Sequence, residues 1–426
     1  MNIIMYLINN VLSQSVYILG LIVLIGLLIQ KEKGSKILPS VIKTMIGYLM
    51  LNSATQYLSG LLQPFQKILV KIFNMDFVVQ DPGTATVSSY ADVATEMSLI
   101  FIIGFFVHLV IARVTKFKYV HLSVHVAFFY SGLIAALLKF GTGLGFVPLI
   151  TIGAIILGIY LTFACTITAP LMQNIKGGEG IALGHSSSCV AWASAKLGKI
   201  FGNKDNDVEK IKFPKGLNFL KEVTVSLALV MVLLYLIVCL IAGPKWVQTE
   251  ISGGMDFVTY SISCGLQIGL WITVMNMGIR MLLAELVPAF HGVAEKLIPN
   301  AMPGLDIPVL FPNHSNCIIL GFVVCLISGL VGMVILSAVG YPVVVFPILI
   351  QTFFCGASAA IFGNSTGGVR GAVIGAWLAG VVLIFGQAFL LPCIGTFAPV
   401  IRVLGDADYC FYGPILGNLL KVLGGI

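Results

Sequence analysis

The sequence predicts an all-α membrane protein that crosses the bilayer many times. Of its 426 residues, 58% are apolar and only 10% are charged, whereas a soluble domain carries roughly 25% charged residues. The mean hydropathy of +1.03 points the same way. About 20 helical residues cross a hydrocarbon layer, so the chain is long enough for about eleven transmembrane helices. A soluble protein, a single-span receptor and a peripheral enzyme are excluded.

Eleven apolar runs are long enough to form these spans. They lie near 8–29, 41–62, 97–112, 122–139, 147–169, 223–243, 257–279, 317–339, 342–362, 371–392 and 409–424. The first run is too long and too weakly charged at its start for a secretory signal, so we expect it to be retained as the first span.

Three segments do not fit simple spans. Residues 171–222 are polar and contain the charged run Lys204–Lys212, which we interpret as a solvated loop without chemistry. Residues 280–316 are semi-polar and broken by prolines, and residues 353–371 are rich in glycine. Irregular polar backbone at membrane depth is tolerated where it is buried in protein or lines a wet cavity, which is where transporters place their sites.

The basic residues predict the orientation of the chain. If the N-terminus is outside, 19 of the 24 Lys and Arg residues fall on the cytoplasmic side, as the positive-inside rule requires. This places the C-terminus in the cytoplasm. The net charge of +7 follows from the same distribution, so we expect no nucleic-acid partner.

Common catalytic and metal-binding motifs are absent from the sequence. The nine cysteines are single and form no C-x-x-C pair, and there is no H-E-x-x-H or Walker motif. We therefore expect no catalytic residue, no metal and no cofactor on this chain.

The sharpest polar pattern is a glycine-rich stretch, Gly177–Gly184, followed by His185, Ser186, Ser187 and Ser188. Hydroxyls and free backbone N–H groups at the start of a helix form a cradle for an oxyanion or a polyol. The alternative is an ordinary helix N-cap with a hydrogen-bonded histidine.

Asp306 lies among apolar residues and prolines, where an ionised carboxylate is costly unless it is paired, hydrogen-bonded or facing water. A binding role is one interpretation, and a carboxylate that holds nearby backbone N–H groups is the other. Glu285 and Arg280 are about one turn apart and are expected to form an intrahelical ion pair with a structural or gating role. His314 belongs to the same class and lies in a turn before a span.

Two further polar positions are candidates. His125 lies inside the fourth apolar run, where a histidine is rare, although a satisfied core histidine is an equal alternative. Asn364 lies in either a glycine-rich turn or the tip of a polar hairpin. A weak match between Gly47–Pro64 and Leu282–Pro299 suggests an inverted repeat.

Several short motifs, in order along most of the chain, resemble a known family. They are Gly184-His185, Arg280-Met-x-x-Ala-Glu285 followed by Ala289-Phe290-x-Gly292, Leu297-Ile-Pro299 with Asp306, and Asn364-x-x-Gly-Gly368-x-Arg370. This pattern resembles the membrane-embedded IIC component of the ascorbate-type bacterial phosphotransferase system.

The resemblance implies a multi-pass protein of the bacterial cell membrane, in contact with lipid. It implies a homodimer of eleven-span protomers, with two re-entrant hairpins in each. Each protomer would have a scaffold domain (about 1–65 and 223–279) and a core domain (about 80–200 and 280–426). A cytoplasmic IIB protein, itself served by IIA, would supply the phosphoryl group.

The resemblance also implies a solute site. Family members hold L-ascorbate with residues matching His125, His185 and Asp306, together with the neighbours of the two histidines. Here Ser186–Ser188 and Phe129 stand where ascorbate members carry glutamine. The implied solute is L-ascorbate or a related sugar, sugar acid or polyol, and the expected site comprises His125, Phe129, His185, Ser186, Ser187, Asp306 and Asn364.

Three functions remain open from the sequence. The first is inward, elevator-type transport coupled to phosphorylation by IIB. The second is an ion-coupled secondary transporter in which Asp306 or Glu285 carries the proton. The third is an intramembrane hydrolase that uses His185 and a serine at 186–188. It is disfavoured because adjacent residues at a helix start seldom point at each other.

Overall fold

A computed structural model describes residues 15–73, 93–211, 223–341, 345, 347–394 and 405–424. The chain begins with α2 (Ser15–Ile29), α3 (Gly34–Phe73), α5 (Ala94–Val114), β1 (Tyr119–His121), α6 (Val124–Gly141), α7 (Phe146–Met172), β2 (Ala182–Leu183), α8 (Ser188–Phe201) and η2 (Val208–Lys210). It continues with α9 (Val223–Ala242), α10 (Pro244–Glu250), α11 (Phe257–Leu297), β3 (Met302–Leu305), η4 (Ile307–Asn313), α12 (Ser315–Ala338), α13 (Leu349–Leu390), η5 (Leu391–Cys393) and α15 (Ala407–Gly424).

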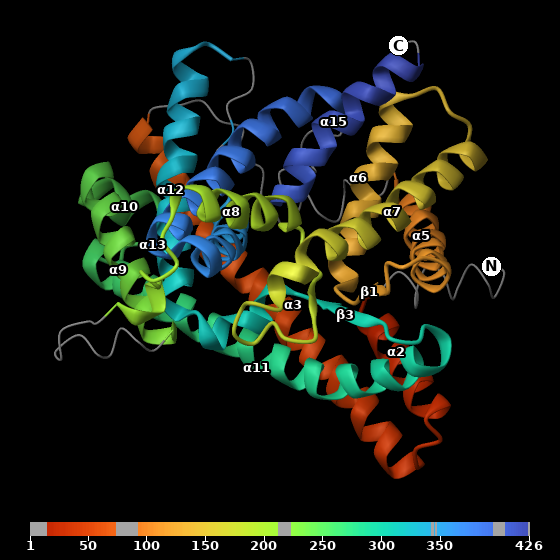
Figure 1. Cartoon of the computed structure of the whole chain (residues 1–426). Coiled ribbons are helices and arrows are strands. Elements are labelled where there is room, and N and C mark those ends of the chain that lie inside the picture. The colour runs from red at the N-terminus through yellow and green to blue at the C-terminus, as the bar shows by residue number, and fades with distance from the viewer. Residues whose placement is uncertain are drawn as a thin grey trace.

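Each predicted apolar run overlaps a helix, and the all-α prediction is confirmed (Figure 1). Among the described residues, six helices are long and apolar enough to cross a membrane, and a bent pair formed by the end of α9 and α10 adds a seventh. Large apolar side chains such as Phe106, Ile159 and Leu266 are more than half exposed on these helices. Apolar surface of this kind is expected where lipid surrounds a protein. The number of eleven spans stays a prediction.

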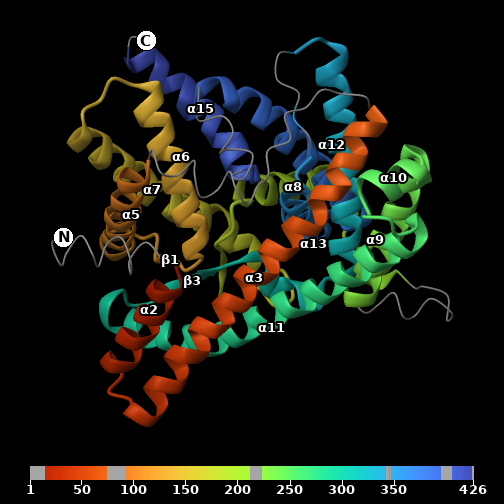
Figure 2. The same ribbon diagram turned by 180° about the vertical axis from the view of Figure 1, so that it is seen from behind.

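The predicted break after residue 279 is wrong. α11 continues unbroken through Arg280 and Pro288 to Leu297 and is 41 residues long. It packs along α3, which is 40 residues long (Figures 1 and 2). Gly47 and Gly278 lie at the crossing, where a Cβ on either would come within 2.7 Å of a backbone oxygen of the other. The inverted repeat that would relate these two segments stays a prediction.

The glycine-rich stretch near Asn364 forms the tip of a helical hairpin. α13 contains one non-helical residue, Gly368, with φ 59° and ψ −149°. A Cβ on Gly363 would lie 2.2 Å from the carbonyl oxygen of Gly371, so the two arms fold back against each other. A glycine turn and a hairpin tip therefore coincide in this stretch, and the two re-entrant hairpins stay a prediction.

The helices pack as two sets. α2, α3, α9 and α11 pack mainly against one another. The second set contains α5, α6, α7, α8, α12, α13 and α15, of which α13 contacts α8, α12 and α15. In Figures 1 and 2, α2 and α11 lie at the bottom of the molecule, with α5, α6, α7 and α15 above them.

A short parallel sheet lies within the second set and joins three distant parts of the chain. β3 is the central strand, with β1 on one side and β2 on the other. Gly304 pairs with both neighbours, and a Cβ there would lie 2.6 Å from Sγ of Cys165 on α7. Only glycine allows this close approach. His108 holds the outer strand, because its Nε2 accepts from the backbone N–H of His121 while its Nδ1 contacts Thr162.

Candidate functional site

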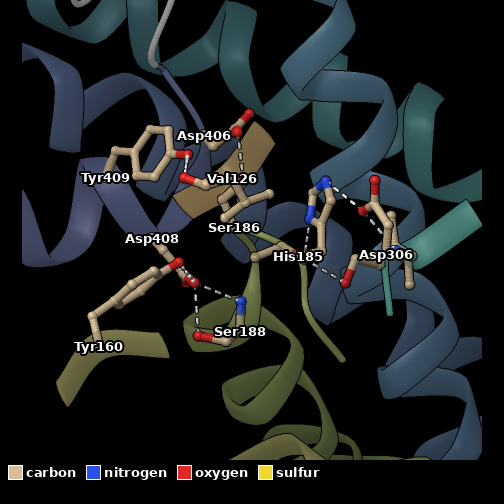
Figure 3. A network of polar contacts seen from close by, with 12 residues as sticks. Val126, Tyr160, His185, Ser186, Ser188, Asp306, Asp406, Asp408 and Tyr409 are labelled. Carbon is tan, nitrogen blue, oxygen red and sulfur yellow. Dashed lines mark hydrogen bonds and ion pairs between the residues drawn. The ribbon is translucent and has the colours of Figure 1, made fainter. Parts of the chain in front are cut away.

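The parallel sheet brings His185 and Asp306 together. Leu183 of β2 pairs with Leu305 of β3, and the backbone N–H of Gly184 donates to the Leu305 carbonyl at 2.6 Å. Each strand therefore ends beside the other and delivers its next polar residue to the same place. Nε2 of His185 lies 3.8 Å from Oδ1 of Asp306, and the two side chains face each other in Figure 3.

The two groups differ in exposure. The His185 side chain is 7% exposed and the Asp306 side chain is 25% exposed. Asp306 also caps η4, because its Oδ1 accepts from the backbone N–H of Ile307 at 2.8 Å. The interpretation of Asp306 as a carboxylate that holds a nearby backbone N–H is confirmed, its carboxylate also faces an imidazole, and its binding role stays a prediction.

A chain of hydroxyls orients the imidazole from behind. Nδ1 of His185 lies 2.8 Å from Oγ of Ser187, and the Ser187 hydroxyl donates to Oγ of Ser358 on α13 at 2.7 Å. Because the Ser187 proton is used in that bond, Ser187 accepts from the imidazole, and Nδ1 carries the proton. In the neutral ring, Nε2 then presents its lone pair toward Asp306.

Two aspartates of the last helical segment complete the cluster, and sequence reasoning did not select them. The Ser186 hydroxyl donates to the carboxylate of Asp406, and the Ser186 carbonyl accepts from the backbone N–H of Asp408. Asp408 is fully buried and accepts from Tyr160, from the hydroxyl and N–H of Ser188, and from the N–H of the next residue. It thereby caps α8 (Figure 3).

The three serines are fully buried, and their hydroxyls bond to other protein groups. Ser186 and Ser187 therefore support Asp406 and His185 from within the protein. The alternative of an N-cap with a hydrogen-bonded histidine is correct for the histidine, but Ser187 at the N-cap position makes no side-chain capping bond, and Asp408 caps the helix instead.

His125 and Phe129 lie on α6. The side chain of His125 is outside the described part of the structure. Its neighbour Val126 accepts a hydrogen bond from Tyr409, which places the start of α6 beside the helix that carries Asp408 (Figure 3). The Phe129 ring packs beside Phe128 with ring centroids 5.9 Å apart, at the edge of a hydrophobic core cluster.

The remaining predicted residues serve contacts between elements. The Asn364 amide donates to Asp207 at 2.7 Å, and its oxygen accepts from the N–H of Val208, so it ties the hairpin tip to η2. His314 occupies the N-cap position of α12, which confirms the predicted turn. The charged run Lys204–Lys212 was predicted to be a solvated loop, but Asp207 and Val208 within it bond to Asn364.

The predicted ion pair between Arg280 and Glu285 is wrong. Glu285 instead accepts from Ser40 at 2.6 Å and pairs with Lys43 at 3.3 Å, both on α3. Positions five apart do not face each other on a helix, whereas positions three or four apart do. Glu285 therefore joins two long helices.

A hydrolase was disfavoured because neighbouring residues at a helix start seldom point at each other. This reason is wrong, because His185 and Ser187 do point at each other. Ser187 is nevertheless fully buried and donates to Ser358, so its oxygen does not face a substrate. The arrangement positions an imidazole and does not activate a nucleophile.

Comparison with known proteins identifies the family. Residues 10–408 match the family EIIC-GAT, described as the sugar-specific permease component of the phosphotransferase system. The chain is also 25% identical to an ascorbate-specific phosphotransferase EIIC component of Mycoplasma pneumoniae, over 97% of this chain and 70% of that protein. With its apolar helices, the chain therefore belongs to the EIIC-GAT family of membrane-embedded sugar permease components of the phosphotransferase system.

Proposed function

We propose that this protein carries a small hydroxyl-rich solute inward and presents it to a cytoplasmic IIB protein for phosphorylation. The solute is L-ascorbate or a related sugar, sugar acid or polyol. The observation that carries the proposal is the pairing of His185 with Asp306 at the ends of two strands, within a chain of the sugar permease family.

The geometry of this pair suits a hydroxyl. A separation of 3.8 Å is too long for a direct hydrogen bond, whereas a hydroxyl oxygen about 2.8 Å from each atom fits beside the pair. The Asp306 carboxylate is an acceptor, and Nε2 of His185 accepts when the proton is on Nδ1 alone, so the pair matches the O–H donors of a sugar or polyol. Neighbouring hydroxyls on one solute satisfy both acceptors at once.

Selectivity follows from the rigidity of the support. Ser187 and Ser358 fix the imidazole, and the cap on η4 fixes the carboxylate. A solute that lacks the matching hydroxyl leaves a desolvated acceptor unpaired, which costs about 1–3 kcal/mol. Asp406, held by Ser186, is the third acceptor that we assign to the solute. We assign His125 as the fourth solute-binding group, because it lies at the start of α6, beside the helix that carries Asp408.

The two sets of helices suit the two roles in transport. We assign α2, α3, α9 and α11 to the scaffold, together with α10, and the remaining elements to the core that carries the solute. The core moves against the scaffold in an elevator-type movement, within a homodimer. Phosphorylation traps the product, because its added charge opposes return through an apolar barrier. The N-terminus lies outside and the C-terminus in the cytoplasm.

Vesicles test this function against an ion-coupled transporter. Vesicles loaded with phosphoenolpyruvate, the soluble phosphotransferase proteins and IIB are given labelled L-ascorbate, monosaccharides, alditols and sugar acids in turn. We expect phosphorylated product for one solute class only when IIB is present. Accumulation of unmodified solute that stops when the proton gradient is collapsed would contradict the proposal.

A further inference from the structure

A second polar cluster lies where η2 meets the start of α12, and transport of the solute does not use it. It consists of Glu209, His314 and Cys317, whose potential ligand atoms all lie within 4.8 Å of one another. Cys317 is fully buried, His314 is 8% exposed and Glu209 is half-buried. Such groups are rarely gathered in a protein interior without a partner.

The imidazole of His314 points to a missing partner. Its Nε2 lies 3.0 Å from the Lys176 carbonyl, which only accepts, so Nε2 carries the proton and donates. The lone pair of Nδ1 then faces the cluster. Within the described residues Nδ1 is buried without a hydrogen-bond partner. A backbone carbonyl that fixes one ring nitrogen while the other binds a cation is the usual arrangement of a metal-bound histidine.

Glu209 and Cys317 supply two further ligands. The Glu209 carboxylate accepts from the backbone N–H groups of Asn316 and Cys317, at 3.2 and 2.8 Å, and so caps α12. Each carboxylate oxygen keeps a second lone pair. The Cys317 sulfur lies within 4.8 Å of the same carboxylate. A thiolate beside this carboxylate would be repelled unless a cation lay between them.

We propose that Glu209, His314 and Cys317 bind a Zn²⁺ ion. Imidazole, thiolate and carboxylate are the three ligand types that zinc prefers, and a water completes four-coordination. The two negative ligands and the neutral imidazole cancel the charge of the ion, which suits a buried position. Binding transfers the thiol proton to solvent. Ligands around tetrahedral zinc are about 3.5 Å apart, so pairs of ligand atoms that now lie within 4.8 Å close in by about 1.3 Å at most.

The ion would fasten three segments together. Lys176 belongs to the loop after α7, Glu209 to η2, and the other two ligands to the start of α12. Asn364 links the same η2 to the hairpin tip of α13. No sequence motif indicates this site, because Glu209 is remote from the other two ligands along the chain.

Cobalt binding to the purified full chain tests the proposal, since Co²⁺ replaces Zn²⁺ and reports thiolate ligation by a charge-transfer absorption band. We expect the band to saturate at one Co²⁺ per chain and to disappear in Cys317→Ser. We expect His314→Gln and Glu209→Gln to weaken Co²⁺ binding by more than about tenfold, because loss of a second-shell partner alone has that effect.

Two matched variants control for general damage. Cys325→Ser removes a buried thiol from the same helix, and Glu179→Gln changes a carboxylate at an exposed residue. Both should keep the band. Added Zn²⁺ should raise the melting temperature of the unmodified chain and leave that of Cys317→Ser unchanged. Absence of the band from the unmodified chain, or its persistence in Cys317→Ser, would overturn the proposal.

Discussion

Asp408 offers the sharpest test of how the site is held, because one buried carboxylate accepts four hydrogen bonds. Its Oδ2 accepts from the Tyr160 hydroxyl at 2.9 Å, from the Ser188 N–H at 3.0 Å and from the Ser188 hydroxyl at 2.7 Å. Its Oδ1 accepts from the Cys189 N–H at 2.8 Å. Asp408→Asn changes the chemistry of this group with little change in size.

The structure sets the size of the effect. If the amide oxygen takes the place of Oδ2, three donors remain satisfied, but the new NH₂ group faces the N–H of Cys189. An unsatisfied buried donor costs about 1–3 kcal/mol, and the lost charge at the start of α8 costs about 0.3–1 kcal/mol. We therefore expect Asp408→Asn to lower the free energy of unfolding by about 1–4 kcal/mol. Asp408→Ala, which removes every acceptor, should be more severe.

The assay is thermal unfolding of the purified, detergent-solubilised protein, scored by the fraction that stays monodisperse after heating. Asp256→Asn is the matched control, because Asp256 accepts from two backbone N–H groups at the start of α11 but is exposed, so water can replace its bonds. We expect a clear decrease in melting temperature for Asp408→Asn and a much smaller one for the control. Equal melting of Asp408→Asn and the unmodified protein would refute the hydrogen-bond argument.

Three further substitutions test how the site is positioned. Gly184→Ala places a Cβ 2.6 Å from the Gly304 carbonyl, so uptake should be lost, whereas Gly145→Ala, in open space, should leave it intact. Ser187→Ala removes the acceptor behind the imidazole and should weaken solute binding, measured at equilibrium, by about tenfold. The melting temperature is measured as well, because an unchanged value shows that the weaker binding does not come from a damaged fold. Asn364→Ala should speed proteolysis at η2 without altering solute affinity, and an unchanged digestion rate would contradict its tethering role.

Much of the fold follows from hydropathy alone. Each predicted apolar run overlaps a helix because a long apolar segment has to satisfy its backbone within itself in lipid. Hydropathy did not predict the full length of α11, because its second half is partly polar but still packed against another helix. α11 passes through Arg280 and Glu285 because Glu285 is paired with α3, a contact that no local pattern reveals.

The sequence indicated two residues of the candidate site and missed two others. His185 and Asp306 stood out as polar residues in apolar surroundings, and the strand pairing that joins them depends on residues far apart in the chain. No sequence pattern used above selects Asp406 or Asp408. Their spacing directly before the apolar run 409–424 is the signal that could have identified them, because carboxylates at the entry to a span require partners.

The serines show what a sequence motif leaves open. Three hydroxyls at a helix start fit a cradle for a solute, but the structure uses them to hold His185, Asp406 and Asp408. A sequence specifies hydroxyl donors without specifying their acceptors. The same limit explains Glu209, a residue of a charged loop that becomes the cap of α12.

The central claim is that His185 and Asp306 bind one solute together, and a double-mutant cycle measures this most directly. Uptake of phosphorylated product is compared for His185→Gln, Asp306→Asn and the double variant, each at equal membrane abundance. Because both groups are needed for the same bound solute, each single variant should lose most of the uptake and the double variant should be hardly worse. Two small, independent losses that add in the double variant would show that the pair is not a shared solute site.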